Sequence, residues 1–410
     1  MPSFSIPLSG LNANSQALSA ISNNLANLNT VGYKDTRMEF RDLFYQQIGS
    51  TGAGEPIEIG AGTAVGSNTG IFTQGSIENS GVNTDIAVQG DGFFVTSKSG
   101  LQEFTRAGNF SLDQNGNLVT TDGANVMGYP GVNGVINTTV PVAPITIAKG
   151  QVTPANATAN VQFGLNLDAT AAVGSTFTAS SPIFDSLGAP HVLSFTFTKT
   201  AANNWNYAVT IPGADVGIPG PPVTLNAGAV TFNGFGQLIA PVANITIPIV
   251  GFADGAANQT FSWNGFAPPQ PSLTQFAGAS AVANSTQDGF PSGSLIDFSV
   301  DQKGVVLGVF SNGQSRAIAQ VALASFANSV GLARTGSNSF QATIASGAAN
   351  VGIAGNGGRG SLQGGSLELS NVDIATEFAR LIVAQRGYQA NAKTVTTFDQ
   401  VTQDTINLKQ

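Results

Sequence analysis

The chain has 410 residues, no cysteine and a formal net charge of -8, and charged residues make up only 9% of it. Fifteen Lys plus Arg over this length are too few to build a phosphate-binding stripe, which excludes nucleic-acid binding. The absence of cysteine excludes disulfides and thiolate chemistry, and the single histidine, His191, excludes sites that need two His ligands. We therefore predict a non-enzymatic protein with no catalytic residue, no cofactor and no metal site.

The first thirty residues do not have the pattern of a cleaved secretory signal. The first basic residue is Lys34, and residues 1–30 contain too much Asn and Ser for an apolar segment. No run approaches the 18 apolar residues of a membrane span, so no membrane insertion is expected. The low charge and lack of cysteine nevertheless suit an extracellular protein, which would leave the cell by a route that reads an uncleaved N-terminus.

A heptad pattern near the N-terminus predicts a helix of about three heptads. Pro7 and Ser9 lie where such a helix can begin, and Asn29, Thr30 and Gly32 lie where it can end. The positions spaced alternately by three and four are Leu11, Asn14, Leu18, Ile21, Leu25 and Leu28.

A second and longer heptad pattern predicts one helix over residues 371–408, with Ser370 as the N-cap and Asp373 at N3. Its register holds without a slip over ten positions. These are Ile374, Phe378, Leu381, Gln385, Tyr388, Ala392, Val395, Asp399, Thr402 and Ile406.

Two interpretations of these helices are open: both could pack on the middle of the chain, or they could pair with each other and with other subunits. Heptads sustained over so long a helix favour the second, because an unpartnered seam is marginal in water. The predicted polymerisation interface consists of Leu11, Leu18, Ile21, Leu25, Leu28, Ile374, Phe378, Leu381, Tyr388, Val395 and Ile406.

Between the two ends, the sequence predicts β structure. Asn-Gly and Asp-Gly pairs recur beside strand-like runs such as the one that follows His191. Proline-rich breaks near 128–160 and 268–293 suggest a β domain inserted into another, and residues 345–366 resemble a Gly/Ser linker. Within that linker, Gly355–Gly360 matches G-x-G-x-x-G but lacks the flanking strand and helix of a nucleotide site.

One short pattern occurs in three copies: Phe110–Leu118, Phe298–Val306 and, more loosely, Thr231–Leu238. We interpret it as a reused strand–turn–strand unit. An ion- or carbohydrate-binding repeat is less favoured, because each copy offers at most one carboxylate.

Several motifs at both ends resemble those of bacterial flagellar rod and hook proteins. Ser9–Ala13 and Ser22–Lys34 are similar to the N-terminal signature of that family, and Ser370–Asp373 with Ala384–Asn391 to its C-terminal signature. Gln89–Val95 and Phe104–Phe110 resemble its inner β domain. The family-motif residues are Asn23, Asn24, Asn27, Thr30, Gly32, Tyr33, Asn371, Asp373, Gln385, Arg386 and Asn391.

The resemblance implies a mainly β fold with helical termini, in which a discontinuous inner β domain carries an inserted outer β domain. A coiled-coil-like helical domain would combine the two ends. The implied domains are the terminal helical domain at 1–30 and 366–410, an extended connector at 31–72, the inner β domain at 73–145 and 286–365, and the outer β domain at 146–285.

Within the family, the inserted domain and the segment Ile183–His191 favour the hook members over the shorter rod members. The resemblance implies a structural subunit that polymerises with itself into a curved, flexible tube, which joins rod to filament and transmits torque. It also implies a distal rod protein, a hook cap protein, a hook–filament junction protein and the type III export apparatus as partners, and a location outside the cell in the flagellum. The alternatives are a rod subunit or, from another class, a secreted β-rich adhesin, which would leave both heptad ends unexplained.

Overall fold

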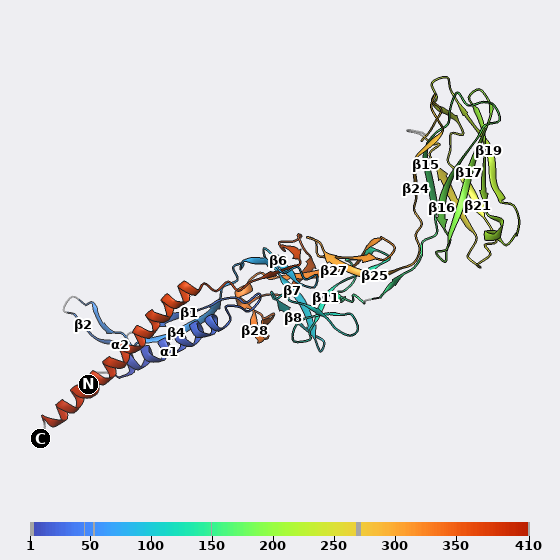
Figure 1. The fold of residues 1–410 in the computed structure, drawn as a ribbon. Coiled ribbons are helices and arrows are strands. Elements are labelled where there is room, and N and C mark those ends of the chain that lie inside the picture. The colour runs from blue at the N-terminus through green and yellow to red at the C-terminus, as the bar shows by residue number, and fades with distance from the viewer. Residues whose placement is uncertain (1–3, 45, 52–53, 149, 268–271, 409–410) are drawn as a thin grey trace. The chain divides into compact units, whose positions relative to one another are not determined.

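The structure is a computed structural model that describes residues 4–44, 46–51, 54–148, 150–267 and 272–408. Residues 1–3 and 409–410 of the expected terminal domain, and 268–271 of the second expected break, lie outside the described residues. The chain divides into two compact units (Figure 1). Unit 1 comprises residues 1–148, 297–308 and 315–410, and unit 2 comprises residues 149–296 and 309–314.

Unit 1 contains two helices, α1 (Ser5–Ala26) and α2 (Ile374–Asn407), one from each end of the chain. Both expected helices are therefore present, and they lie side by side (Figure 1). The N-cap of α2 is Asp373 rather than Ser370, because the Asp373 carboxylate accepts the Thr376 backbone N–H at 2.6 Å. The Ser370 hydroxyl instead accepts the Val372 backbone N–H one turn earlier.

Four strands follow α1 in the segment expected to be an extended connector. They form two antiparallel ladders, one between β1 (Thr36–Asp42) and β4 (Thr63–Gly70) and one between β2 (Gln46–Ser50) and β3 (Pro56–Ile59). The segment is thus extended but internally paired, which satisfies backbone groups that an isolated connector would leave to water.

The sheet of unit 1 is antiparallel, with the order β25-β26-β27-β11-β7-β8-β29-β28. Its core gathers Phe93, Phe104, Tyr129 and Phe340 on one side. The strands are β7 (Phe93–Lys98), β8 (Leu101–Thr105), β11 (Asn125–Val132), β25 (Gly293–Val300), β26 (Val305–Phe310), β27 (Ser315–Ser325), β28 (Ala333–Gly336) and β29 (Ser339–Gln341).

Shorter strands extend this sheet or form two-stranded ladders beside it. They are β5 (Ile77–Asn79), β6 (Ile86–Gln89), β9 (Ser111–Leu112), β10 (Leu118–Val119), β12 (Val135–Ile136), β13 (Ala143–Pro144), β30 (Asn350–Ile353), β31 (Ser361–Gly364) and β32 (Ser366–Glu368).

The expected Gly/Ser linker at 345–366 is wrong for most of its length. β30 pairs with β27, and β31 pairs with β6, so the segment is part of the folded β structure. The Gly355–Gly360 match is the turn between these strands, closed by the Gly355 N–H on the Gly360 carbonyl. Glycine is required here for positive φ and close backbone approach, and its abundance was misleading as a sign of flexibility.

Unit 2 contains two sheets that share one core. One sheet has the order β16-β17-β18-β19-β20, and the other has the order β21-β22-β15-β23, with β24 also paired to β15. Alternate residues face inward, as Phe195 and Phe197 of β17 show, and they meet Phe163 and Trp263 of the other sheet. The strands of these sheets are β15 (Asn160–Asn166), β16 (Thr176–Phe184), β17 (Pro190–Ala201), β18 (Asn204–Ile211), β19 (Val223–Phe232), β20 (Leu238–Ala240), β21 (Ile245–Ile249), β22 (Gln259–Asn264), β23 (Leu273–Thr274) and β24 (Ala281–Gln287). Outside them, β14 (Val152–Thr153) pairs with the start of β25.

The three copies of the short pattern adopt the same turn, which confirms a reused strand–turn–strand unit. In each, one side-chain oxygen accepts the backbone N–H groups two and four residues later. This atom is Oδ1 of Asp113, Asp301 or Asn233, at 2.8–2.9 Å. Asp185 makes the same turn between β16 and β17.

In the described part of the chain, no helix is both long enough and apolar enough to cross a membrane.

Candidate functional site

The helices α1 and α2 run antiparallel and touch through small residues. Gly10 lies opposite Asn391, Gly387 lies opposite Asn14, and Ala17 packs with Ala384. The asparagines also bind their own helices, because each Nδ2 donates to the carbonyl four residues earlier, that of Gly10 or Gly387. Residues without large side chains at these points allow the two helices to approach closely.

The predicted seam is divided between two surfaces. Ile21 is buried in the contact between the helices, with Leu18, Leu25 and Leu381 packed around it. Leu11, Leu28 and Val395 are half-buried. Four residues of α2 are instead exposed: Ile374, Phe378, Tyr388 and Ile406.

The predicted polymerisation interface stays a prediction, and within one chain only part of it lies in the contact between the two helices. The residues buried in that contact are Ile21 and two small residues, Ala17 and Ala384. The physical reason is size, since small residues let the backbones approach and direct the larger neighbours to either side of the contact. The outward apolar residues of α2 remain available for another partner.

Asn24 is the centre of the N-terminal motif and is fully buried. Its Nδ2 donates to the Thr36 carbonyl at 2.8 Å and to Oε2 of Glu377 on α2 at 3.2 Å. Its Oδ1 accepts the backbone N–H and the hydroxyl of Thr36, and also the hydroxyl of Tyr33. One asparagine thus joins α1, the first strand and α2.

The remaining N-terminal motif residues shape the end of α1. The Asn23 Nδ2 donates to the Tyr33 hydroxyl, and the Thr30 hydroxyl donates to Asn27 Oδ1. Gly32 has a φ of 65°, and a Cβ there would lie 2.6 Å from the backbone of Ala107. Only glycine fits this position, and the Gly32 N–H donates to the Glu368 carbonyl.

The C-terminal motif residues have two different environments. Asn371 accepts the Asp35 backbone N–H at 2.7 Å and donates to the Ile71 carbonyl at 2.8 Å, so it fastens the start of α2 to the N-terminal segment. Asp373 caps α2, and Asn391 lies in the helix contact. Gln385 and Arg386 are exposed on α2.

A buried ion triad, Lys34–Glu368–Arg106, lies at the base of the helix pair. Lys34 Nζ is 2.7 Å from Glu368 Oε1, and Arg106 Nε is 2.9 Å from Glu368 Oε2. The Glu368 side chain is 0% exposed. Burial, followed by the charge of Arg106, lowers the pKa of Lys34, and Glu368 opposes this shift.

The triad joins three segments that are distant in sequence: the end of the N-terminal motif, the inner sheet and the strand before α2. Backbone groups complete it, since Lys34 donates to the Thr73 carbonyl and Arg106 donates to the carbonyls of Gly90 and Gly92. The terminal helices are therefore anchored to the sheet of unit 1 by charge-assisted hydrogen bonds in a dry environment.

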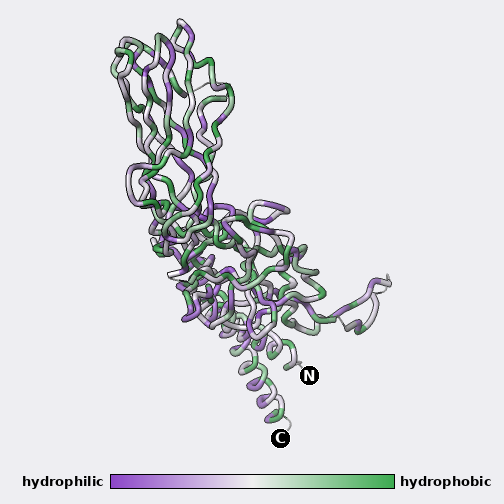
Figure 2. Tube along the Cα trace, turned by 90° about the vertical axis from the view of Figure 1, so that its right-hand side faces the viewer, coloured by the Kyte–Doolittle hydropathy of each residue, from purple (hydrophilic) through white to green (hydrophobic). Residues whose placement is uncertain are grey.

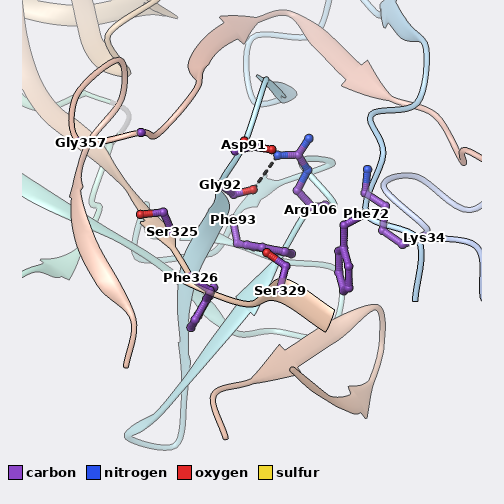
Figure 3. A pocket seen from close by; sticks show the side chains of 11 residues that line it. Lys34, Phe72, Asp91, Gly92, Phe93, Arg106, Ser325, Phe326, Ser329 and Gly357 are labelled. Atoms are coloured by element: carbon purple, nitrogen blue, oxygen red, sulfur yellow. Dashed lines mark hydrogen bonds between the residues drawn. The ribbon is translucent and has the colours of Figure 1, made fainter. Parts of the chain in front are cut away.

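A cavity of about 310 Å³ lies beside the triad. Figure 3 shows Arg106 directed toward Gly92, and the lining of the cavity also includes Phe72 and Phe93. Because Lys34 and Arg106 already bind Glu368 and backbone carbonyls, and Asp91 also lines the cavity, we assign it no ligand.

A second charged cluster lies between the first strand and α2. Arg380 Nη1 bonds to Glu377 Oε1 and is 3.5 Å from Asp35 Oδ2. Burial and then the charge of Glu377 raise the pKa of Asp35, and Arg380 opposes this shift.

Sequence reasoning missed Glu368, Glu377 and Arg380. It included Lys34 and Arg106 in the motifs Ser22–Lys34 and Phe104–Phe110 but assigned them no ionic partner. A usable signal was the scarcity of charge: in a chain with 9% charged residues, a charge inside a motif or an apolar run has a specific partner. The partners themselves are hundreds of residues apart, so spacing alone does not identify them.

Four family models match successive parts of the chain. They are the flagella basal body rod protein at residues 6–34, the flagellar hook protein D1 domain at 87–164, the flagellar basal body protein FlaE D2 domain at 175–290 and the flagellar basal body rod C-terminal domain at 363–408. The D2 match lies within unit 2.

Full-length relatives agree with these matches. The flagellar hook protein of Treponema pallidum is 34% identical over 455 residues, covering 98% of both chains. That of Salmonella typhimurium is 36% identical over 423 residues, covering 99% of this chain and 100% of the relative. A crystal structure of a Helicobacter pylori flagellar hook protein shares the fold, with a TM-score of 0.53 at 14% identity, covering 70% of this chain and 99% of that one. The chain therefore belongs to the flagellar hook protein family, a family of structural proteins.

Proposed function

We propose that this chain is a structural subunit of the bacterial flagellar hook and assembles with copies of itself into a tube. The observation that carries the proposal is the outward apolar face of α2, which consists of Ile374, Phe378 and Ile382. These side chains are 47%, 52% and 55% exposed and are spaced four residues apart, so they follow one side of the helix.

The length of α2 supports the same conclusion. Its 34 residues span about 51 Å, against about 33 Å for the 22 residues of α1. Phe398 meets Phe4, the first described residue, and α2 continues beyond that point with Val401 and Ile406 exposed. Apolar and polar residues alternate along this part of the helix (Figure 2). An apolar helix surface of this kind is stable in water when neighbouring copies cover it.

A groove of about 620 Å³ runs beside the helix pair and adds to this surface. Its apolar lining includes Ala17, Ile21, Met38 and Val383, and Arg37 and Arg380 also line it. A tube of identical subunits needs contacts between unlike surfaces that repeat without closing on themselves. The outward face of α2 and this groove are two unlike surfaces of one chain, which suits such an arrangement.

The proposal includes a curved, flexible tube that joins rod to filament and transmits torque. A bending tube requires neighbouring subunits to shift against each other, and directional ion pairs resist such shifts. Charged residues make up only 9% of the whole chain, so few directional ion pairs are available to hold neighbouring subunits in one position.

The proposed partners follow from the same role. They are further copies of this chain, a distal rod protein, a hook cap protein, a hook–filament junction protein and the type III export apparatus, with the assembled protein outside the cell. We expect no catalytic activity. A chain without cysteine cannot be locked by disulfides, which suits export in an unfolded state.

The test removes residues 371–410 and compares the truncated chain with the full chain by electron microscopy. Both tryptophans, Trp205 and Trp263, are buried in unit 2, so their fluorescence reports whether that unit is still folded. We expect tubes from the full chain, and a folded unit 2 without tubes from the truncated chain. Tubes from the truncated chain would contradict the proposal.

A further inference from the structure

The one histidine of the chain lies among three carboxylates at one end of unit 2. His191 Nε2 is 3.1 Å from Asp185 Oδ2, and His191 Nδ1 is 3.1 Å from Asp215 Oδ2. The carboxylate of Asp254 completes the group, since ligand atoms of Asp185, His191 and Asp254 all lie within 4.8 Å of one another. The sequence predicts no metal site, yet His191 is only 7% exposed and lies among these carboxylates.

We propose that Asp185, His191 and Asp254 bind a divalent transition-metal ion of the Zn²⁺ class, with Asp215 orienting the histidine. Neutral imidazole carries one N–H and one lone pair. If Nδ1–H donates to Asp215, the lone pair of Nε2 faces the acceptor oxygen of Asp185. Two acceptors 3.1 Å apart repel unless a positive species lies between them.

The charge of the site favours a metal ion over a single proton. Three carboxylates and a neutral imidazole carry a charge of -3, and among the described residues no Lys or Arg forms a salt bridge with any of them. Protonation of His191 would offset one of these charges, whereas a divalent cation offsets two.

Hydrogen bonds hold two of the proposed ligands, Asp185 and His191, in fixed orientations, as metal sites require. Asp185 Oδ1 accepts the backbone N–H groups of Leu187 and Ala189 at 2.8 and 2.9 Å, which fixes the carboxylate and leaves Oδ2 for a ligand. A carboxylate on the second ring nitrogen, as Asp215 supplies, is the usual support of a metal-binding histidine.

The distances fit an ion of this size. Ligand atoms about 2.0–2.1 Å from Zn²⁺ lie about 2.8–3.4 Å from one another at octahedral or tetrahedral angles. The separation of Asp185 Oδ2 from His191 Nε2 is 3.1 Å. Asp254 is exposed between Gly251 and Gly255, both at positive φ, in a loop that can bring its carboxylate closer.

Such an ion would join the turn after β16, the start of β17 and the 251–255 loop. Binding to the folded state alone stabilises it by mass action. A full chain stripped of metal with a chelator is therefore heated with and without Zn²⁺, and unfolding of unit 2 is followed by tryptophan fluorescence. At 100 times the Kd, the midpoint should rise by about 5–10 °C.

Asp254→Asn should abolish this rise, because it removes a ligand and leaves the contacts of His191 with Asp185 and Asp215 in place. Asp168→Asn is the matched control, since Asn can still accept the Thr170 backbone N–H, and it should keep the full rise. Visible absorption of Co²⁺ bound in place of Zn²⁺ gives a second readout, which the Asp254 change should alter.

No Zn²⁺-dependent rise in the unaltered chain would overturn the proposal and leave a protonated histidine as the positive group. An equal rise in Asp254→Asn would overturn it as well, because the ion would then bind elsewhere. Neither outcome bears on assembly through α2, so this test and that of the proposed function fail separately.

Discussion

Gly10 of α1 and Asn391 of α2 occupy one contact, in which a Cβ on Gly10 would lie 2.8 Å from the Asn391 side chain. Gly387 and Asn14 repeat the arrangement with the helices exchanged, at 2.7 Å. Each helix thus presents a glycine to the asparagine of the other. This reciprocal contact sets how closely the two ends of the chain approach each other.

Replacing either glycine with alanine should destabilise the helix pair by about 1–3 kcal/mol, because the new methyl group overpacks the contact. At an exposed position of a helix, the same change would stabilise the helix by about 1 kcal/mol. A loss of stability therefore shows that the glycine lies in a tight contact. Chemical denaturation followed by far-ultraviolet circular dichroism measures the effect for Gly10→Ala and Gly387→Ala. Ser15→Ala, on the exposed side of α1, should have little effect. A stabilised Gly10→Ala variant would contradict the packing described here.

The Lys34–Glu368–Arg106 triad should be far more sensitive than a surface ion pair. Glu368→Gln leaves two buried cations without a carboxylate, and we expect a loss of about 3–5 kcal/mol in the free energy of unfolding of unit 1. The control is Asp122→Asn, which breaks the Lys98–Asp122 pair of 2.8 Å, where the lysine side chain is 47% exposed. That change should cost less than about 1 kcal/mol. Equal losses would show that the triad does not anchor the helices.

The start of α2 should weaken in acid. Hydrogen bonding from the Thr376 backbone N–H lowers the pKa of Asp373 below its ordinary value of 3.8. Because the folded-state pKa is depressed, the stabilisation is fully present above 3.8 and is lost as the pH falls through the folded-state pKa. The Thr376 amide chemical shift should follow this titration. Asp373→Asn keeps a good N-cap and should remove the titration, whereas an unchanged titration would contradict this assignment.

Tryptophan fluorescence should report the unfolding of unit 2 separately from that of unit 1. Phe195→Ala removes a fully buried ring that contacts Phe163 and Trp263, and we expect a loss of about 3–5 kcal/mol in the tryptophan-detected transition. The helical signal of α1 and α2 should be unchanged, since both helices belong to unit 1. A matching loss in the helical signal would contradict the division into units.

The periodic elements could be predicted from the sequence, and their exact contacts could not. The heptads predict both helices, but the contact between them buries two small residues, Ala17 and Ala384, beside Ile21. The spacing of apolar residues does not show how closely small residues let two helix backbones approach. The short repeat was predictable because an Asp or Asn that caps a turn acts locally.

Long-range polar contacts were beyond the reach of sequence reasoning. Glu368 meets Lys34 and Arg106, and His191 meets Asp254, only because the fold brings distant segments together. The segment 345–366 was mistaken for a linker because glycine abundance does not distinguish flexible chain from tight turns between paired strands.

The most direct test of the central claim changes only the outward face of α2. The double variant Phe378→Ser, Ile382→Ser is compared with the unaltered chain and with Gln389→Ser, an exposed polar control on the same helix. Electron microscopy of the concentrated proteins should show tubes for the unaltered chain and the control, and dispersed single subunits for the double variant. Tubes of normal appearance from the double variant would contradict assembly through this face.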